Sequence, residues 1–185
     1  MKQRYLIAIL PPKELGIEID NIRKACSQKF KVYKALRPPV HITLRYIHEL
    51  EESYEPKLIT SLSAARSFEP FIQHLHNFSG FQTAKAIYVA ATENKQIDNL
   101  YTQIINLTKP FCKDASGGRT PHLTIAYRDV TPRLYLEIME YYKNQTFQAD
   151  FEVNHFSLLK HDGTCWNVLK HFYSLPGPHQ LEIPL

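Results

Sequence analysis

The sequence has few cysteines and no long apolar run, and both shortages limit what the protein can be. Its three cysteines among 185 residues include no CxxC pair, so neither a disulfide framework nor a zinc ribbon is indicated. The N-terminal apolar run at residues 5–10 is stopped by Pro11 and Pro12, too early for a signal peptide or a membrane span. We therefore expect a cytoplasmic protein that does not enter a membrane.

The chain also lacks a strong charge bias. Its 22 Lys and Arg oppose 18 Asp and Glu, for a formal net charge of +4. This excess is too small to indicate a surface that coats nucleic acid, although it permits a phosphate-bearing partner. Hydrophobic residues make up 44% of the chain, with 10 Phe and 11 Tyr, which is enough for a core without disulfides or structural metals. We expect one domain over residues 1–185, acting as a monomer.

Two halves of the chain repeat the same pattern. Residues 40–44 (VHITL) match residues 121–125 (PHLTI) at an offset of 81 positions. Apolar runs typical of buried strands begin 36 residues before each motif histidine, and a helical spacing of apolar residues follows each run. A second helical pattern and a further strand follow each motif. Because an entire succession of elements repeats, chance similarity of one short motif is a poor explanation.

The repeat predicts an α+β protein with two pseudo-symmetric β-α-β-α-β lobes, whose sheets flank a central cleft. The halves span about residues 1–81 and 82–175, and their terminal strands are candidates for exchange between the lobes. One strand is expected between residues 150 and 159, and another from residue 166. Pro176, Gly177 and Pro178 introduce a tail whose role the sequence does not indicate.

Each motif places an imidazole and a hydroxyl on one strand face. Side chains alternate along a strand, so His41 lies on the same face as Thr43, and His122 on the same face as Thr124. If these faces meet in one cleft, two imidazoles flank a single point. One neutral histidine can then take a proton while a protonated one gives a proton, and the hydroxyls can hold phosphate oxygens. The four residues therefore predict a phosphate site that requires no metal.

Two arginines and one loop are further candidates for this site. Continued alternation puts Arg45 on the His41 face and Arg128 on the His122 face, where either cation can offset phosphate charge. Solvent-exposed charge explains both equally well. The glycine-containing loop at residues 114–119 can cover the cleft or serve as a plain surface connection.

The paired His-x-Thr motifs in this spacing resemble those of the 2H phosphoesterases, in particular the branch called 2′–5′ RNA ligase or RNA 2′,3′-cyclic phosphodiesterase. The resemblance covers about residues 4–172. It implies a bilobal α+β fold that opens cyclic phosphodiesters without metal or other cofactor. It also implies catalytic roles for His41 and His122 and phosphate binding by Thr43 and Thr124. The implied substrate is a cyclic-phosphate nucleotide or an RNA terminus.

Two other interpretations use the same motif residues, and a third uses a different pair of histidines. The cleft can bind a nucleotide or RNA end without turnover, or it can run phosphodiester opening in reverse as an ATP-independent 2′–5′ RNA ligase. No P-loop or adenylylated-lysine context indicates an ATP-driven ligase. His74 and His76 have the spacing of metal ligands on one strand face, but without a third ligand we interpret them as ordinary polar residues.

Overall fold

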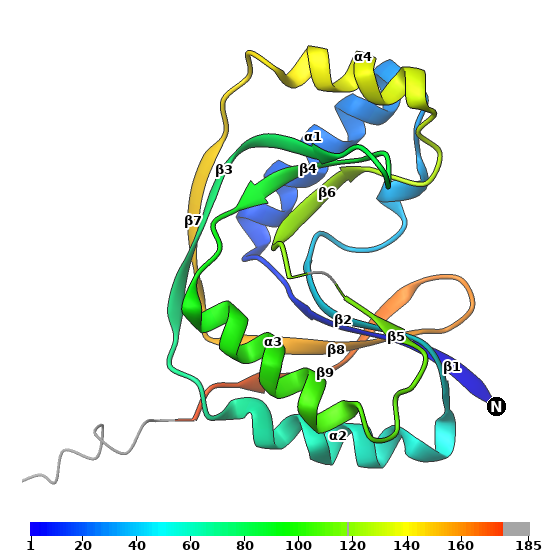
Figure 1. Ribbon diagram of the computed structural model, residues 1–185, viewed down its shortest axis with the longest axis vertical. Helices are drawn as coiled ribbons and strands as arrows, with labels where there is room; N and C mark the ends of the chain where they lie inside the picture. Colours follow the sequence, from blue (N-terminus) through cyan, green and yellow to red (C-terminus); the bar gives the residue numbers. More distant parts are fainter. Residues whose placement is uncertain (118, 176–185) are drawn as a thin grey trace, which may run out of the picture.

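Two antiparallel sheets form the framework of the protein in the computed structural model, which describes residues 1–117 and 119–175 (Figure 1). The tail from Pro176 lies outside the described residues. In the five-stranded sheet the strands run in the order β5 (Ala115–Ser116), β2 (Ile42–Glu51), β1 (Lys2–Ile9), β8 (His155–His161), β9 (Trp166–Tyr173). In the four-stranded sheet the order is β6 (His122–Ala126), β4 (Ala86–Ala91), β3 (Phe71–Phe81), β7 (Gln148–Val153).

Each sheet carries two helices and forms one lobe. Helices α1 (Lys13–Phe30) and α4 (Pro132–Tyr142) pack against the four-stranded sheet, at the top of Figure 1. Helices α2 (Glu55–Ser63) and α3 (Lys95–Thr108) pack against the five-stranded sheet, at the bottom. Short 3₁₀ turns lie at Lys34–Leu36, Glu52–Tyr54 and Ala64–Arg66. We call these units the four-stranded lobe and the five-stranded lobe. The predicted bilobal α+β fold is confirmed.

The two halves of the chain exchange elements between these lobes. β1 pairs with β2 and β8, and β4 pairs with β6 and β3, so each central strand has one neighbour from its own half and one from the other half. Helix α1, from the first half, lies against β6 of the second. The single strand expected between residues 150 and 159 is wrong, because the chain breaks at Asn154 into β7 and β8, which join different sheets.

The central strand β1 of the five-stranded sheet is buried on both of its faces. Tyr5, Ile7 and Ile9 belong to the main hydrophobic core, whereas Leu6 and Ala8 form a second cluster with Leu159 on the opposite face. Burial on both faces explains the uninterrupted apolar run of this strand. Among the residues that the structure describes, no helix is long and apolar enough to cross a membrane.

Candidate active site

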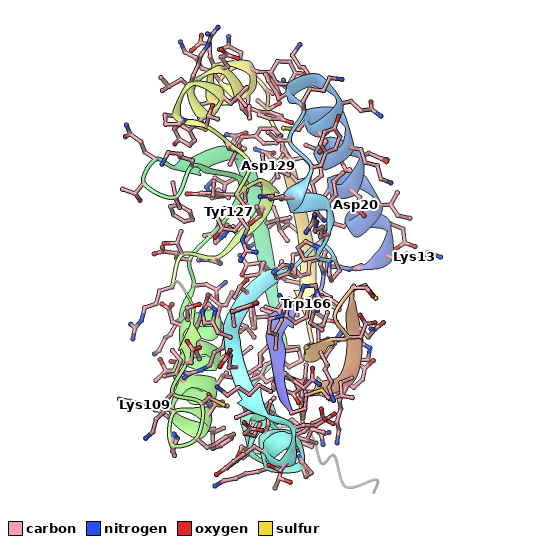
Figure 2. The ribbon with its side chains drawn as sticks, turned by 90° about the vertical axis from the view of Figure 1, so that its right-hand side faces the viewer. Lys13, Asp20, Lys109, Tyr127, Asp129 and Trp166 are labelled. Atoms are coloured by element: carbon pink, nitrogen blue, oxygen red, sulfur yellow. The ribbon has the colours of Figure 1, made fainter. Side chains whose placement is uncertain are left out.

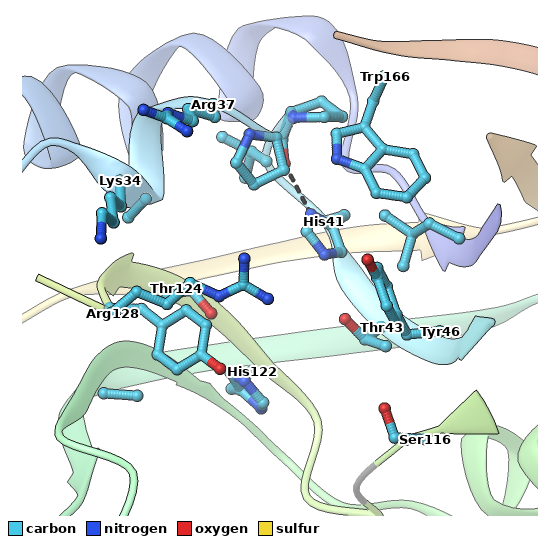
Figure 3. A pocket seen from close by; sticks show the side chains of 18 of the residues that line it. Lys34, Arg37, His41, Thr43, Tyr46, Ser116, His122, Thr124, Arg128 and Trp166 are labelled. Carbon is cyan, nitrogen blue, oxygen red and sulfur yellow. Dashed lines mark hydrogen bonds between the residues drawn. The ribbon is translucent and has the colours of Figure 1, made fainter. Parts of the chain in front are cut away.

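A cleft of about 570 Å³ lies where the two lobes meet (Figure 3). β2 of the five-stranded lobe contacts β6 of the four-stranded lobe, and the motif residues of both strands line the cleft. His41 immediately precedes β2 and Thr43 lies at its start, while His122 and Thr124 come from the start of β6. The alternating apolar residues, such as Ile42, are fully buried and anchor the strands. The structure thus brings the four motif residues of the two halves into one cleft.

Both histidines are held in the same orientation by the backbone. Nδ1 of His41 lies 2.7 Å from the carbonyl oxygen of Pro39, and Nδ1 of His122 lies 2.8 Å from that of Thr120. A carbonyl can only accept, so each Nδ1 carries the proton and donates it. Each neutral ring therefore leaves its Nε2 lone pair free to take a proton from a bound molecule.

The surroundings of both imidazoles disfavour the protonated form. Burial, with a smaller contribution from the charges of Arg23 and of a protonated His122, lowers the pKa of His41 to about 4, although the hydrogen bond to Pro39 acts in the opposite direction. Burial also lowers the pKa of His122. In the free protein at neutral pH both rings are therefore neutral. One of them becomes an acid when a bound anion favours its protonation.

The cleft is lined by cationic side chains, namely Arg4, Arg23, Lys34, Arg37 and Arg128. Among the described residues, no Asp or Glu lines it. Arg23 is 2% exposed and donates from Nη2 to the carbonyl oxygen of Pro38, 2.9 Å away. That carbonyl immediately precedes the one that orients His41, so Arg23 fixes the backbone there. The positive lining favours an anionic ligand.

The segment that leads from α1 to His41 is also tied to the chain just past β6. Oδ2 of Asp129, just past β6, accepts from the backbone N–H groups of Tyr33 at 2.7 Å and of Lys34 at 3.0 Å. Figure 2 shows Asp129 beside the segment that joins α1 to β2. These bonds hold the segment that leads to His41 against the strand that carries His122.

The two candidate arginines separate in the structure. Arg128 lines the cleft, in a left-handed backbone conformation (φ 72°) beyond the end of β6. Arg45 does not line the cleft, so the expectation that it shares the face of His41 is wrong. An extra residue, Leu44, bulges out of β2 opposite the Ile7–Ala8 step of β1 and shifts the alternation by one position. Arg45 is 8% exposed and donates to the carbonyl oxygen of Cys112, while Tyr46 takes the cleft position.

Several cleft residues are absent from the sequence prediction; they are Arg4, Arg23, Lys34, Arg37, Tyr46, His48, His161 and Trp166. The only available signal was Trp166, since it is the single tryptophan of the chain. Within the loop expected at residues 114–119, Ala115 and Ser116 form β5, and Ser116 lines the cleft. Gly118 lies outside the described residues.

His74 and His76 lie away from the cleft. Nδ1 of His74 is 2.7 Å from Oδ1 of Asp150 on β7, and Nδ1 of His76 is 3.3 Å from the hydroxyl of Thr92. Over residues 1–117 and 119–175, no three His, Cys, Asp or Glu side chains group into a possible metal site.

Comparison with known proteins identifies the family. The sequence profile of the 2′-5′ RNA ligase superfamily matches residues 11–164. E. coli LigT in apo form is 19% identical, with a TM-score of 0.66 over 95% of this chain and 99% of LigT. TT0787 of Thermus thermophilus is 18% identical, with a TM-score of 0.60 over 95% of this chain and all of TT0787 (100%). The search of curated proteins gave no match. This chain therefore belongs to the 2′-5′ RNA ligase superfamily, within the 2H phosphoesterases.

Proposed function

We propose that the protein is a metal-independent cyclic phosphodiesterase that opens the 2′,3′-cyclic phosphate of an RNA end or a nucleotide. The observation that carries this proposal is the pair of histidines, each with Nδ1 bound to a backbone carbonyl and Nε2 free, in one cation-lined cleft. A ring nitrogen on each side of a phosphorus atom suits in-line displacement, which needs a base at one oxygen and an acid at the other.

The proposed reaction is a hydrolysis with two proton transfers. The Nε2 of one histidine takes a proton from a water molecule as the water oxygen bonds to phosphorus. The P–O bond to one ribose oxygen breaks, and the other histidine, protonated, gives its proton to that oxygen. The hydroxyls of Thr43 and Thr124 donate to the non-bridging oxygens, and Arg128 offsets their charge. The product is a ribose phosphomonoester with a free hydroxyl beside it.

The solved relatives support a nucleotide as the ligand. LigT of E. coli has been crystallised with 3′-AMP, with ATP and with phosphate. These ligands share a phosphate group, and two of them carry an adenine nucleoside. A nucleotide in the cleft of this protein is therefore part of the proposal.

A chelator-treated assay tests the proposal. Purified protein is given 2′,3′-cyclic nucleotides and an RNA with a 2′,3′-cyclic end, beside the variants His41→Ala, His122→Ala and His74→Ala. We expect turnover that survives chelation and falls by about 10² to 10⁴ in each cleft variant. His74→Ala, which removes an exposed histidine far from the cleft, should behave like the wild type. Wild-type turnover in either cleft variant would overturn the two-histidine mechanism.

Analysis of the recovered products separates the alternatives. Ligand returned intact by a folded protein would favour a nucleotide-binding module. Joined RNA strands without ATP would favour ligation, since the same groups serve the reverse reaction.

A cytoplasmic location is also proposed, and the three unpaired cysteines, Cys26, Cys112 and Cys165, support it. The monomeric state stays a prediction.

A further inference from the structure

Two buried polar side chains, one from each of the helices α1 and α3, hold the segment around His41. Arg23 of α1 is 2% exposed, and its Nη2 donates to the carbonyl oxygen of Pro38 at 2.9 Å. Tyr101 of α3 is 2% exposed, and its hydroxyl donates to the carbonyl oxygen of Thr43. These two carbonyls lie on either side of His41 in the chain. Helices from both lobes therefore fix the backbone that carries His41 (Figure 1).

Helix packing alone does not require an arginine at position 23. The offset of 81 residues that relates the two motifs places Arg23 opposite Ile104 of α3, which is fully buried. Ser27 donates its hydroxyl hydrogen to the carbonyl oxygen of Arg23 at 2.8 Å. Thr108 donates in the same way to the carbonyl oxygen of Ile104 at 2.6 Å, so the two helix positions are equivalent. One half of the chain thus fills this position with an apolar residue, whereas the other half buries a charge there.

Burial of Arg23 is costly for stability. Its Nε is buried and has no hydrogen-bond partner. Its Nη1 donates to Oδ1 of Asp20 at 2.9 Å, but the Asp20 side chain is 42% exposed, so water screens the pair. A desolvated guanidinium with an unsatisfied nitrogen stabilises a protein less than a well-packed apolar residue does. The cost indicates that Arg23 serves the backbone it binds, next to the Pro39 carbonyl that orients His41.

Tyr101 binds at a point where β2 is irregular. Thr43 immediately precedes Leu44, the residue that bulges from β2, and a bulge interrupts the hydrogen-bond ladder between strands. The hydroxyl of Tyr101 supplies a donor to the Thr43 carbonyl at this point. The equivalent position of α1 holds Asp20, which bonds to Arg23 instead. Both helix positions therefore act on the first of the two motifs, which breaks the pseudo-symmetry of the cleft.

The charged groups that act on His41 all oppose its protonation. Burial lowers the pKa of the ring, and the charges of Arg23 from α1 and of a protonated His122 from β6 act in the same direction, against the hydrogen bond to Pro39. The other titratable side chains of the lining include no carboxylate among the described residues; they are Arg4, Lys34, Arg37, Tyr46, His48, Tyr127, Arg128 and His161. Loss of Arg23 should therefore make His41 easier to protonate, because it removes a cation and loosens the segment that buries the ring.

We propose that Arg23 and Tyr101 are positioning residues for the first motif, Arg23 for the His41 imidazole and Tyr101 for the Thr43 hydroxyl. This inference rests on the proposed function, because it gives both side chains a part in the two-histidine reaction. Each acts through a backbone carbonyl and not on the reacting phosphate. His122 should be affected far less, since the helix position equivalent to Arg23 holds Ile104.

Nuclear magnetic resonance of the histidine rings tests Arg23 without turnover. The signals of His41 and His122 are assigned among the nine histidines with the variants His41→Ala and His122→Ala. In Arg23→Met we expect His41 to titrate at a higher pH than in the wild type, and His122 to shift much less. An unchanged His41, or equal shifts of both rings, would overturn the positioning role.

The matched control is Arg66→Met, since Arg66 is a half-buried arginine that donates to the carbonyl oxygen of Tyr173 at 2.7 Å, outside the cleft lining. Both rings should titrate in Arg66→Met as in the wild type.

Kinetics with 2′,3′-cyclic AMP test Arg23 a second time. We expect kcat to fall about 10²-fold in Arg23→Met, because a small misplacement of a reacting group is costly, and to stay at the wild-type value in Arg66→Met. Arg23→Lys should lose about 10-fold, because an ammonium keeps the charge but cannot hold Asp20 and Pro38 in the fixed geometry of a guanidinium. If Arg23→Met does not fold, Arg23→Lys decides: wild-type kcat in that variant would overturn the role of Arg23.

A double-mutant cycle tests Tyr101. Tyr101→Phe should lower kcat about 10-fold in the wild-type background and have little further effect in a Thr43→Val background, where the hydroxyl that it positions is absent. Tyr5→Phe is the control, because it removes another fully buried hydroxyl, one that donates to Glu55 at 2.8 Å, and it should leave kcat unchanged. Equal losses for Tyr101→Phe in the two backgrounds would show a purely structural role and overturn the proposal.

Failure of this inference and failure of the proposed function give different results. If the wild type did not turn over any cyclic phosphate, the proposed activity would fail, whereas the histidine titration in Arg23→Met would still decide the role of Arg23. Calorimetry with inorganic phosphate would decide that of Tyr101. Weaker binding in Tyr101→Phe than in Tyr5→Phe would support positioning of Thr43, and equal binding would overturn it.

Discussion

His41 and His122 owe their expected reactivity to burial and to one backbone hydrogen bond each. Both pKa values lie below the ordinary histidine value of 6.5, that of His41 at about 4. The active form needs one neutral and one protonated ring, and kcat/KM reports the pKa values of the free enzyme. Because both values are lowered, the bell-shaped profile of kcat/KM against pH should be centred below pH 6.5. A steady-state pH series checks this expectation, and a maximum above pH 6.5 would contradict it.

Arg45 and Arg128 should respond oppositely to substitution. Arg45→Met removes a buried donor to the carbonyl of Cys112, so unfolding should become easier by about 1 to 3 kcal/mol. Its kcat/KM should stay within about threefold of the wild type. Arg128→Gln, at an exposed cleft position, should lower kcat/KM by roughly 10-fold with unchanged stability, since it removes a charge that offsets phosphate. Denaturant unfolding and steady-state kinetics measure both variants. Lost kcat/KM in Arg45→Met, or lost stability with unchanged kcat/KM in Arg128→Gln, would contradict these roles.

Helix α3 begins at a cap that also reaches the other lobe. Oδ1 of Asn94 accepts from the backbone N–H of Ile97 at 2.8 Å, and Nδ2 donates to Oε1 of Gln73 on β3 at 3.2 Å. Gln73 is fully buried. The same residue therefore caps a helix of the five-stranded lobe and bonds to a strand of the four-stranded sheet.

Loss of this cap should be costly for stability and neutral for chemistry. Asn94→Ala should reduce the free energy of unfolding by about 1 to 2 kcal/mol, because a helix N–H and a buried amide both lose a partner. Thr131→Ala, which removes only the cap bond to Leu134 of α4, serves as the matched control and should cost less. Thermal unfolding measures both, and equal losses would show that the Gln73 bond contributes nothing.

The lobes of the whole molecule are interdependent because each contains strands from both halves of the chain. The five-stranded sheet needs β8, and the four-stranded sheet needs β3. Residues 1–81 alone would leave β3 without β4 and β7, and residues 82–175 alone would leave β8 without β1. A strand without partners, such as β3, or an isolated two-stranded hairpin, such as β8 with β9, does not form a stable sheet.

We therefore expect one cooperative unfolding transition for the full chain. Trp166 fluorescence reports the five-stranded sheet and far-ultraviolet circular dichroism reports both lobes, so the two denaturation curves should coincide. Each half expressed alone should be unfolded. Separate transitions for the two probes, or an independently folded half, would contradict the exchange of strands as a source of cooperativity.

Local periodicity in the sequence was sufficient to predict most elements. Apolar residues spaced three or four positions apart from Leu15 to Cys26 predict helix α1, and the continuous apolar run at residues 5–9 predicts β1. Burial imposes both patterns directly. The offset of 81 residues between His41 and His122 likewise predicts that the motif repeats in two similar lobes, whereas the meeting of the two motif faces depended on how the lobes pack. Periodicity failed at Asn154, since no local pattern shows that β7 and β8 belong to different sheets.

The sequence by itself determined which residue types repeat and on which strand faces they begin, because alternation along a strand follows from backbone geometry. Only the tertiary structure decided which residues complete the cleft. The bulge at Leu44 depends on how β2 pairs with β1, and it turns Arg45 inward and Tyr46 outward. Trp166 reaches the same surface from a strand 120 positions later in the chain, through pairing of β9 with β8. Such long-range pairing has no signal in local sequence, because it depends on the packing of the complete sheet.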